Sequence, residues 1–143
     1  MSEELATVQN QSIISMDTNN ASVFFTGSLD TQADKVAFFN ATQNPDTQLK
    51  DHINEKIELV NFFCQEIECE SQTEPGAKDK CPRIILFAAD GTTYACVSFG
   101  VLSSLKNILN IFGSPATWDE PLTVIPKLIN KGADRSVLTL KIA

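Results

Sequence analysis

The order of strand and helix patterns in the sequence predicts an all-β domain with one helix. It is expected to be a five-stranded Greek-key barrel with a strand or arm added at its N-terminus. Three observations support this fold class. An Asp-Gly pair separates two apolar β-forming runs, a long alternating run precedes that hairpin, and an amphipathic helix follows it before two further strand-like runs.

The length and composition fit one globular domain. The chain has 143 residues, of which 43% are hydrophobic and 20% charged. No apolar run approaches the roughly 20 residues that span a bilayer, and the N-terminus lacks the pattern of a signal peptide. We expect a soluble cytoplasmic protein without membrane contact, with a flexible arm at 1–20, one domain at 21–143 and a barrel core at about 55–143.

The first half of the chain contains three strand predictions. Residues 22–29 and 35–41 are short β-like runs, and residues 42–54 are predicted as a loop. Residues 56–69 form a long run whose ends alternate, with the odd positions apolar. Its middle is apolar on both faces, which predicts either a bulged and strongly bent strand or a local hydrophobic patch on the outer face. A loop rich in Pro, Gly and charge follows at 70–82.

The Asp90-Gly91 pair predicts a two-residue type I′ hairpin turn. That turn would place Phe87 opposite Tyr94 and sort the side chains by parity onto two faces. The face predicted to be buried holds Ile84, Leu86, Ala88, Thr93, Ala95, Val97 and Phe99. The face predicted to be exposed holds Arg83, Ile85, Phe87, Ala89, Thr92, Tyr94, Cys96 and Ser98.

The C-terminal third completes the predicted barrel. Residues 101–112 have helical apolar spacing and are stopped by Gly113 and Pro115. Residues 117–130 are predicted as an edge or bulged strand because they contain two prolines, and residues 136–142 as the last strand. The predicted order is a long bent strand, a hairpin, a helix and two further strands. This is the element order of the OB-fold.

The exposed face of the hairpin suggests a ligand. An Arg beside two rings suits unpaired bases and their phosphates, because stacking on an aromatic ring contributes on the order of 1–3 kcal/mol per base. The predicted site residues are Tyr94, Phe87, Arg83, Phe62 on the outer face of the long strand, Lys56 beside it, Lys78 and Lys80 in the 70–82 loop, and Trp118 before the fourth strand. A cross-strand Phe–Tyr pair can also serve only to stabilise a hairpin, or be covered by the N-terminal arm.

The net charge of −7 argues against a nucleic-acid ligand at first sight. Residues 1–75, however, hold three lysines and 13 acidic residues, whereas residues 76–143 hold eight basic and five acidic residues. The second part of the chain is therefore positively charged, which raises the question of where these charges point, although such charges usually only cover a solvated surface.

The reactive side chains predict neither a metal site nor an enzyme. Cys64, Cys69, Cys81 and Cys96 have no C-x2-C spacing, and the single His52 has no partner at metal-ligand spacing. We expect reduced buried thiols and no cofactor, with a disulfide or a metal site as the alternative. The sequence contains no nucleophile motif, no phosphate-binding loop and no structured carboxylate pair.

Three segments resemble a known family. "FAADG" (87–91) followed by Tyr94, "FFNAT" (38–42) and "SVLTLKI" (136–142) are similar to the single-stranded-DNA-binding protein of small tailed phages with protein-primed replication. The resemblance covers about residues 34–143. It places the "FFNAT" segment on a strand before the long one.

The resemblance implies an OB-type core without catalytic activity that coats displaced single strands in the host cytoplasm, with tyrosines for stacking. Only Tyr94 matches a motif tyrosine, so Phe62, Phe63 or Phe87 would replace the others. The expected partners are single-stranded DNA and the replicative DNA polymerase, and the oligomeric state, monomer or homodimer, stays open. The alternative is a non-enzymatic protein–protein interaction module that uses the same aromatic face.

Overall fold

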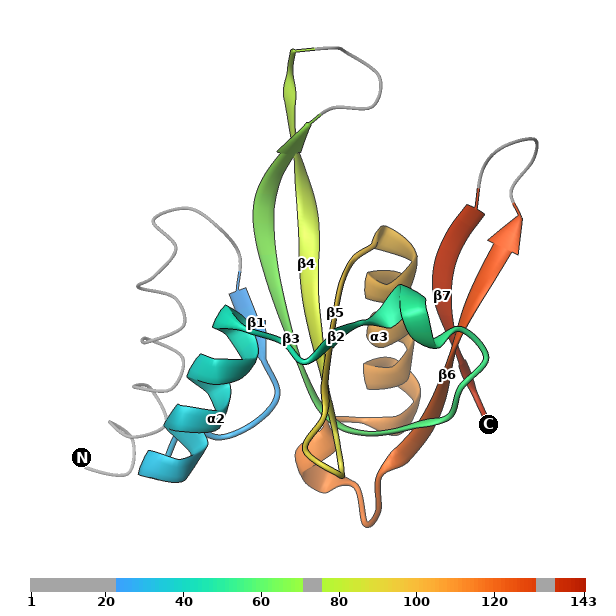
Figure 1. Cartoon of the computed structure of the whole chain (residues 1–143). Helices are drawn as coiled ribbons and strands as arrows, with labels where there is room; N and C mark the ends of the chain where they lie inside the picture. The colour runs from blue at the N-terminus through green and yellow to red at the C-terminus, as the bar shows by residue number, and fades with distance from the viewer. Residues whose placement is uncertain (1–22, 71–75, 131–135) are drawn as a thin grey trace.

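The computed structural model describes residues 23–70, 76–130 and 136–143, which form one curled sheet and two α helices (Figure 1). The strands are β1 (Val23–Phe25), β2 (Thr47–Gln48), β3 (Ile57–Glu70), β4 (Lys78–Ala88), β5 (Thr93–Val97), β6 (Leu122–Asn130) and β7 (Ser136–Ile142). The helices are α2 (Gln32–Gln43) and α3 (Phe99–Phe112), with 3-10 turns η1 (Leu49–His52) and η2 (Pro115–Thr117). The predicted arm at 1–20, the middle of the 70–82 loop and most of the turn before the last strand lie outside the described residues.

The sheet has the strand order β2-β5-β4-β3-β6-β7, and β1 pairs with β3. From β3 onward the elements follow the predicted order, with α3 between the third and fourth barrel strands. The described residues nevertheless form seven strands and two helices, not five strands and one helix. The sheet is a half barrel, because β5 pairs with the added strand β2 and, within the described ranges, β7 pairs with β6 alone.

Strand β2 is held beside β5 by a reciprocal contact between Asp46 and Thr93. The backbone N–H and the hydroxyl of Thr93 donate to Asp46 Oδ2 at 3.0 and 3.2 Å, and the Asp46 N–H donates to Thr93 Oγ1 at 2.9 Å. These bonds satisfy a buried polar side chain and fix the chain just before β2. The segment 42–54, predicted as a loop, therefore supplies an edge strand and a 3-10 turn.

The predicted bulge in the long strand is confirmed. The pairing of β3 with β4 shifts between Leu59 and Asn61, so one extra residue is inserted there. A bulge reverses the parity of the side chains that follow it. Leu59 and Phe62 consequently face the same core, whereas Phe63 faces the opposite side of the sheet.

The hairpin turn contains three residues instead of the predicted two. The Gly91 N–H donates to the Ala88 carbonyl at 3.0 Å, and the Ala88 N–H donates to the Thr92 carbonyl at 2.9 Å. Only Gly91, at φ +90°, has a positive φ in this turn, whereas a type I′ turn needs one at Asp90 as well. The Asp90 side chain instead accepts the Thr92 N–H at 2.9 Å and stabilises the longer loop.

The extra turn residue shifts the register of the hairpin by one. Phe87 lies opposite Thr93, and Leu86 lies opposite Tyr94. The predicted pairing of Phe87 with Tyr94 is therefore wrong, and every side chain of β5 is on the face opposite to the predicted one. Tyr94 and Cys96 share the face of Ile84, Leu86 and Ala88.

The run 35–41, predicted as a strand, belongs to helix α2. The Thr31 hydroxyl caps this helix by accepting the Asp34 N–H at 3.0 Å. Phe38 and Ala41, one helical turn apart, then contact the outer face of the sheet. A short apolar run fits either period, and here the cap and the spacing favour the helix.

Both faces of the central strands are covered, in contrast to the prediction of one buried and one exposed face. Helix α3 packs on one face with Val101, Leu105 and Ile108, and α2 covers the other, where it packs with side chains of the neighbouring strand β1 (Figure 1). The helix predicted over residues 101–112 is thus confirmed as α3. Its first turn lies on β7, where an added Cβ at Gly100 would collide with the Leu138 carbonyl.

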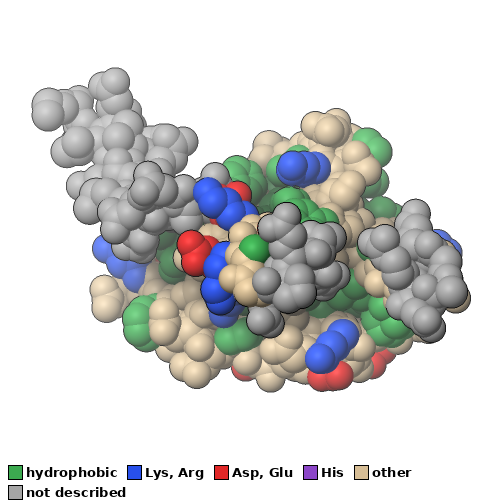
Figure 2. All heavy atoms as spheres, turned by 90° about the horizontal axis from the view of Figure 1, so that it is seen from above, with side chains coloured by type: hydrophobic (Ala, Val, Ile, Leu, Met, Phe, Trp, Pro, Cys, Tyr) green, Lys and Arg blue, Asp and Glu red, His purple; other side chains and the backbone are tan. Residues whose placement is uncertain are grey.

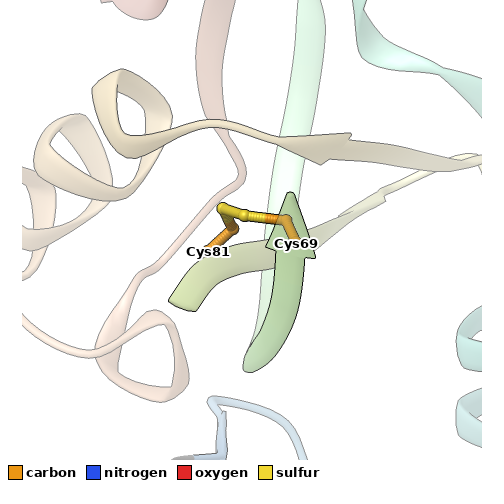
Figure 3. Close-up of a disulfide and its surroundings, with 2 residues drawn as sticks. All are labelled: Cys69 and Cys81. Carbon is orange, nitrogen blue, oxygen red and sulfur yellow. A yellow bond between two sulfur atoms is a disulfide. The ribbon is translucent and has the colours of Figure 1, made fainter. Parts of the chain in front are cut away.

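Cys69 and Cys81 form a disulfide across the β3–β4 ribbon (Figure 3). Their Cα atoms are 6.1 Å apart, and the register places them diagonally on adjacent strands. The expectation of four reduced thiols is therefore wrong for this pair. Cys64 and Cys96 are free, and burial raises the pKa of each thiol to about 12.

Candidate nucleic-acid interface

The predicted aromatic surface of the hairpin is divided between the two sides of the sheet. Tyr94 lies on the side of the sheet that faces the main core and α3. Phe87 and Arg83 lie on the opposite side, which α2 covers. The one-residue shift in register causes this separation. A single surface that combines these three side chains does not exist in the structure.

Arg83 and Phe87 both hold the N-terminal elements against the sheet. The Arg83 guanidinium donates to the Thr42 carbonyl at 2.7 Å, near the end of α2. The Phe87 ring contacts the Phe25 ring, with 5.5 Å between centroids. Both side chains are thus held by α2 and β1, and any contact with a ligand stays a prediction. The alternative that the N-terminal arm covers a Phe87–Tyr94 pair is not met, because these two side chains lie on opposite sides of the sheet and the arm lies outside the described residues.

Two other predicted rings have structural contacts. Phe62 is 1% exposed in the main core, so its ring has no free face for a base and its predicted outer position is wrong. The Trp118 indole N–H donates to the carbonyls of Phe112 and Gly113, at 3.1 Å each. Trp118 thus fastens the end of α3, and its predicted role at the ligand remains untested.

Tyr94 and Lys56, two of the predicted residues, line one hollow of about 510 Å³ beside the Asp90 turn. We refer to it as the Tyr94 hollow. Its wall includes Ala88 and Thr123, and two acidic residues, Glu58 and Asp90. The hollow therefore offers one ring and one cation together with negative charge, which suits stacking better than a phosphate contact.

The Tyr94 ring is braced by His52 and stays partly exposed. The two rings meet edge to face with centroids 5.1 Å apart. His52 is itself held at both nitrogens, by Thr47 Oγ1 and by Glu55 Oε1, at 3.0 Å each. Partial burial, followed by the negative charges of Asp90, Glu55 and Asp46, raises the pKa of Tyr94 above its ordinary value.

Lys78 and Lys80 lie on β4, not in the predicted loop, because that strand begins at Lys78. Lys80 lines a second hollow, of about 320 Å³, between the β3–β4 ribbon, β1 and the start of α3. We refer to it as the Phe99 cleft. Two of its rings are exposed to solvent, Phe24 by 48% and Phe99 by 63%. Figure 2 looks onto this end of the molecule, where Lys and Arg side chains lie beside hydrophobic ones.

The Phe99 cleft carries a balance of charge that favours an anion. The Lys80 ammonium lies 3.5 Å from the Glu66 carboxylate, and both groups are partly exposed. Lys106 extends into the cleft from α3 and forms no salt bridge with a described carboxylate. Its charge lowers the pKa of the Cys64 thiol at the same cleft, against the larger effect of burial.

Comparison with known families decides the biochemical class. Residues 17–143 match the family described as "Phage Single-stranded DNA-binding protein". The chain belongs to this family. No curated protein sequence and no solved structure gives a significant match. The family resemblance that the hairpin motif and the last strand suggested is thereby confirmed over nearly the whole chain.

Three residues that line the Phe99 cleft were not among the predicted site residues: Phe24, Phe99 and Lys106. Phe99 was placed on the buried face because strand alternation was carried past the end of β5. Ser98, a residue type that caps helices, was the signal that the strand ends before Phe99. Phe24 had no distinguishing signal, since it belongs to a three-residue strand.

None of the helices in residues 23–70, 76–130 and 136–143 has the length and apolar character needed to cross a bilayer. The same described residues contain no cluster of three His, Cys, Asp or Glu side chains suited to a metal ion.

Proposed function

We propose that the protein binds single-stranded DNA without sequence preference and coats strands displaced during phage DNA replication in the host cytoplasm. Bases stack on exposed rings, and no reaction is catalysed. The observation that carries this proposal is the partly exposed, braced Tyr94 ring in a hollow that also holds Lys56, in a chain of this family.

Stacking is the main source of affinity in this proposal. Among the described residues, Lys56 is the only basic one that lines the Tyr94 hollow, and Glu58 and Asp90 lie there too. A phosphate would therefore gain little from the hollow, whereas a base needs only the face of the phenol ring. The salt dependence of binding should accordingly be modest, in keeping with the net charge of −7.

The test is a titration of fluorescently labelled oligo-dT with the parent protein, Tyr94→Ala and Tyr94→Phe, followed by anisotropy. Removing the ring should weaken binding roughly five- to 150-fold, the equivalent of about 1–3 kcal/mol. Tyr94→Phe keeps the stacking surface and should bind like the parent. Circular dichroism checks that each variant is folded. Unchanged binding by Tyr94→Ala would show that this ring does not stack.

The same titration separates DNA binding from the alternative of a protein-interaction module. Leu128 and Ile129, 55% and 43% exposed on β6, are apolar side chains that a partner such as the replicative polymerase could cover. If the parent protein binds no oligo-dT even at low salt, the module is the better description. Binding that is specific for single strands over a duplex of the same length supports the proposed function.

A further inference from the structure

We propose that the Phe99 cleft is a second site for single-stranded nucleic acid, separate from the Tyr94 hollow. A base stacks on the exposed rings of Phe99 and Phe24, and Lys106 with Lys80 contacts the adjoining phosphates. This inference rests on the proposed function and extends it, because one strand would then be held at two places on the protein.

The Phe99 ring is exposed although its backbone is firmly fixed. The hydroxyl of Ser98 accepts the Val101 N–H at 3.1 Å and donates to the Leu138 carbonyl at 3.0 Å, which joins the start of α3 to β7. Gly100, the next residue, lies so close to the Leu138 carbonyl that no side chain fits there. A ring that projects into water from such a fixed point can receive a base at little cost in conformational entropy.

Phe24, from β1, provides a second aromatic surface in the same cleft. It pairs with Cys64 in the β1–β3 register and packs at 5.9 Å between ring centroids against the buried Phe62. Its ring thus rests on the core on one side and remains 48% exposed on the other. Of the large hydrophobic side chains that are exposed, Phe24 and Phe99 line the same cleft, and exposed rings gathered in one hollow mark a binding surface.

The charges of the cleft select a nucleic acid over an apolar peptide. Phe99 and Lys106 are seven residues apart on α3, two helical turns, and therefore lie on the same face. Lys106 has no carboxylate partner among the described residues. The pair of Lys80 with Glu66 is exposed and of the kind that contributes little stability, so a phosphate can take the place of the carboxylate.

The two proposed sites lie at different ends of the half barrel. The Tyr94 hollow is formed at the Asp90 turn and the beginnings of β3 and β6. The Phe99 cleft is formed farther along the β3–β4 ribbon, at the start of α3 (Figure 1). Because the two linings share no residue, a substitution in one site leaves the other intact, and the two proposals can be tested independently.

The decisive experiment compares Phe99→Ala, Phe99→Tyr and Ile111→Ala with the parent in oligo-dT anisotropy titrations. Phe99→Ala should weaken binding at least fivefold, whereas Phe99→Tyr keeps the ring and should bind like the parent. Ile111 is exposed on the same helix but outside the cleft, so Ile111→Ala is the matched control. If Phe99→Ala does not fold, Phe99→Leu removes the aromatic face while filling the same surface.

A salt titration tests the cation separately. Lys106→Gln should lower the slope of log affinity against log salt by about 0.7, the value for one phosphate contact on a single strand. Lys50→Gln is the control, because Lys50 is exposed on η1 and lines neither hollow. An unchanged slope for Lys106→Gln, together with unchanged affinity for Phe99→Ala, overturns the second site.

The outcomes separate the two proposals. Weakening by Phe99→Ala supports the second site whether or not Tyr94→Ala has an effect. Weakening by Tyr94→Ala alone overturns the second site and leaves the proposed function in place. If the parent protein binds no single strand at all, both proposals fail together.

Discussion

The hydroxyl of Ser104 in α3 accepts the backbone N–H of Leu140 in β7 at 3.1 Å. The same hydroxyl donates to the Gly100 carbonyl at 3.0 Å, so it links the helix to the strand. The hydroxyl of Ser98, which caps the start of α3, donates to the carbonyl of Leu138 in the same strand, β7. The edge of β7 that faces away from β6 thus obtains hydrogen bonds from a helix, where a closed barrel would use another strand.

We therefore expect Ser104→Ala to destabilise the protein without touching either proposed binding site. The substitution leaves the Leu140 N–H without its partner, and the loss of one partly buried hydrogen bond costs about 1 kcal/mol. Urea unfolding followed by circular dichroism measures the difference. Ser103→Ala, at the exposed neighbouring position of the same helix, should change the free energy of unfolding by less than about 0.5 kcal/mol. Equal stability of the two variants would show that the hydroxyl bridge contributes nothing.

The single tyrosine of the chain makes its ionisation directly measurable. Partial burial and neighbouring carboxylates raise the pKa of Tyr94 above 10.0, so the phenolate absorbance should appear at higher pH in the folded protein than in urea. Because the folded state holds this proton more tightly, the resulting stabilisation is complete below about pH 10 and is lost as the pH rises through the folded-state pKa.

Asp90→Asn provides the matched control for this titration. The amide keeps an oxygen that can accept the Thr92 N–H, and it removes the charge. The pKa of Tyr94 should then move toward its ordinary value, although burial, the larger cause, remains. A midpoint that is identical in the folded and the urea-unfolded protein would mean that Tyr94 is fully hydrated and not braced in its hollow.

The four cysteines should be labelled in two steps, none of them in the folded protein. At pH 8 the thiols of Cys64 and Cys96, with pKa values of about 12, hold only roughly one part in 10⁴ as thiolate, so a maleimide should not label the folded protein. Unfolding without reductant should add two labels, and unfolding with reductant four. Mass spectrometry counts them. Because Cys64 is only partly buried and lines the Phe99 cleft, rapid labelling of the native protein at this residue would show that its pKa is not raised.

Much of the fold was predictable because its patterns are local. The long alternating run of β3, including its bulge, and the helix of α3 are visible in the spacing of apolar residues. Helix α2 was missed because the run 35–41 has only seven residues, too few to distinguish the apolar spacing of a helix from that of a strand. The available signal was Thr31 with Asp34 three residues later, an N-terminal capping pattern that outweighs the β-propensity of the two phenylalanines.

The candidate site was less predictable, because the position of Tyr94 depends on the length of the loop at Asp90-Gly91. Whether the Asp90-Gly91 loop has two or three residues decides on which side of the sheet Tyr94 lies, and the sequence permits both. The parity of β5 follows from that choice alone. The cleft at Phe99 is lined by residues of β1, β3, β4 and α3, and β1 and α3 are far apart in sequence, so no local pattern could have indicated it.

The bond between Cys69 and Cys81 makes the tip of the β3–β4 ribbon a covalent ring with a sequence separation of 12 residues. A protease that cuts once inside that ring cannot divide the molecule: the halves stay tethered through sulfur. Such a nicked protein would migrate as one band in a gel run without thiols and as two bands after reduction.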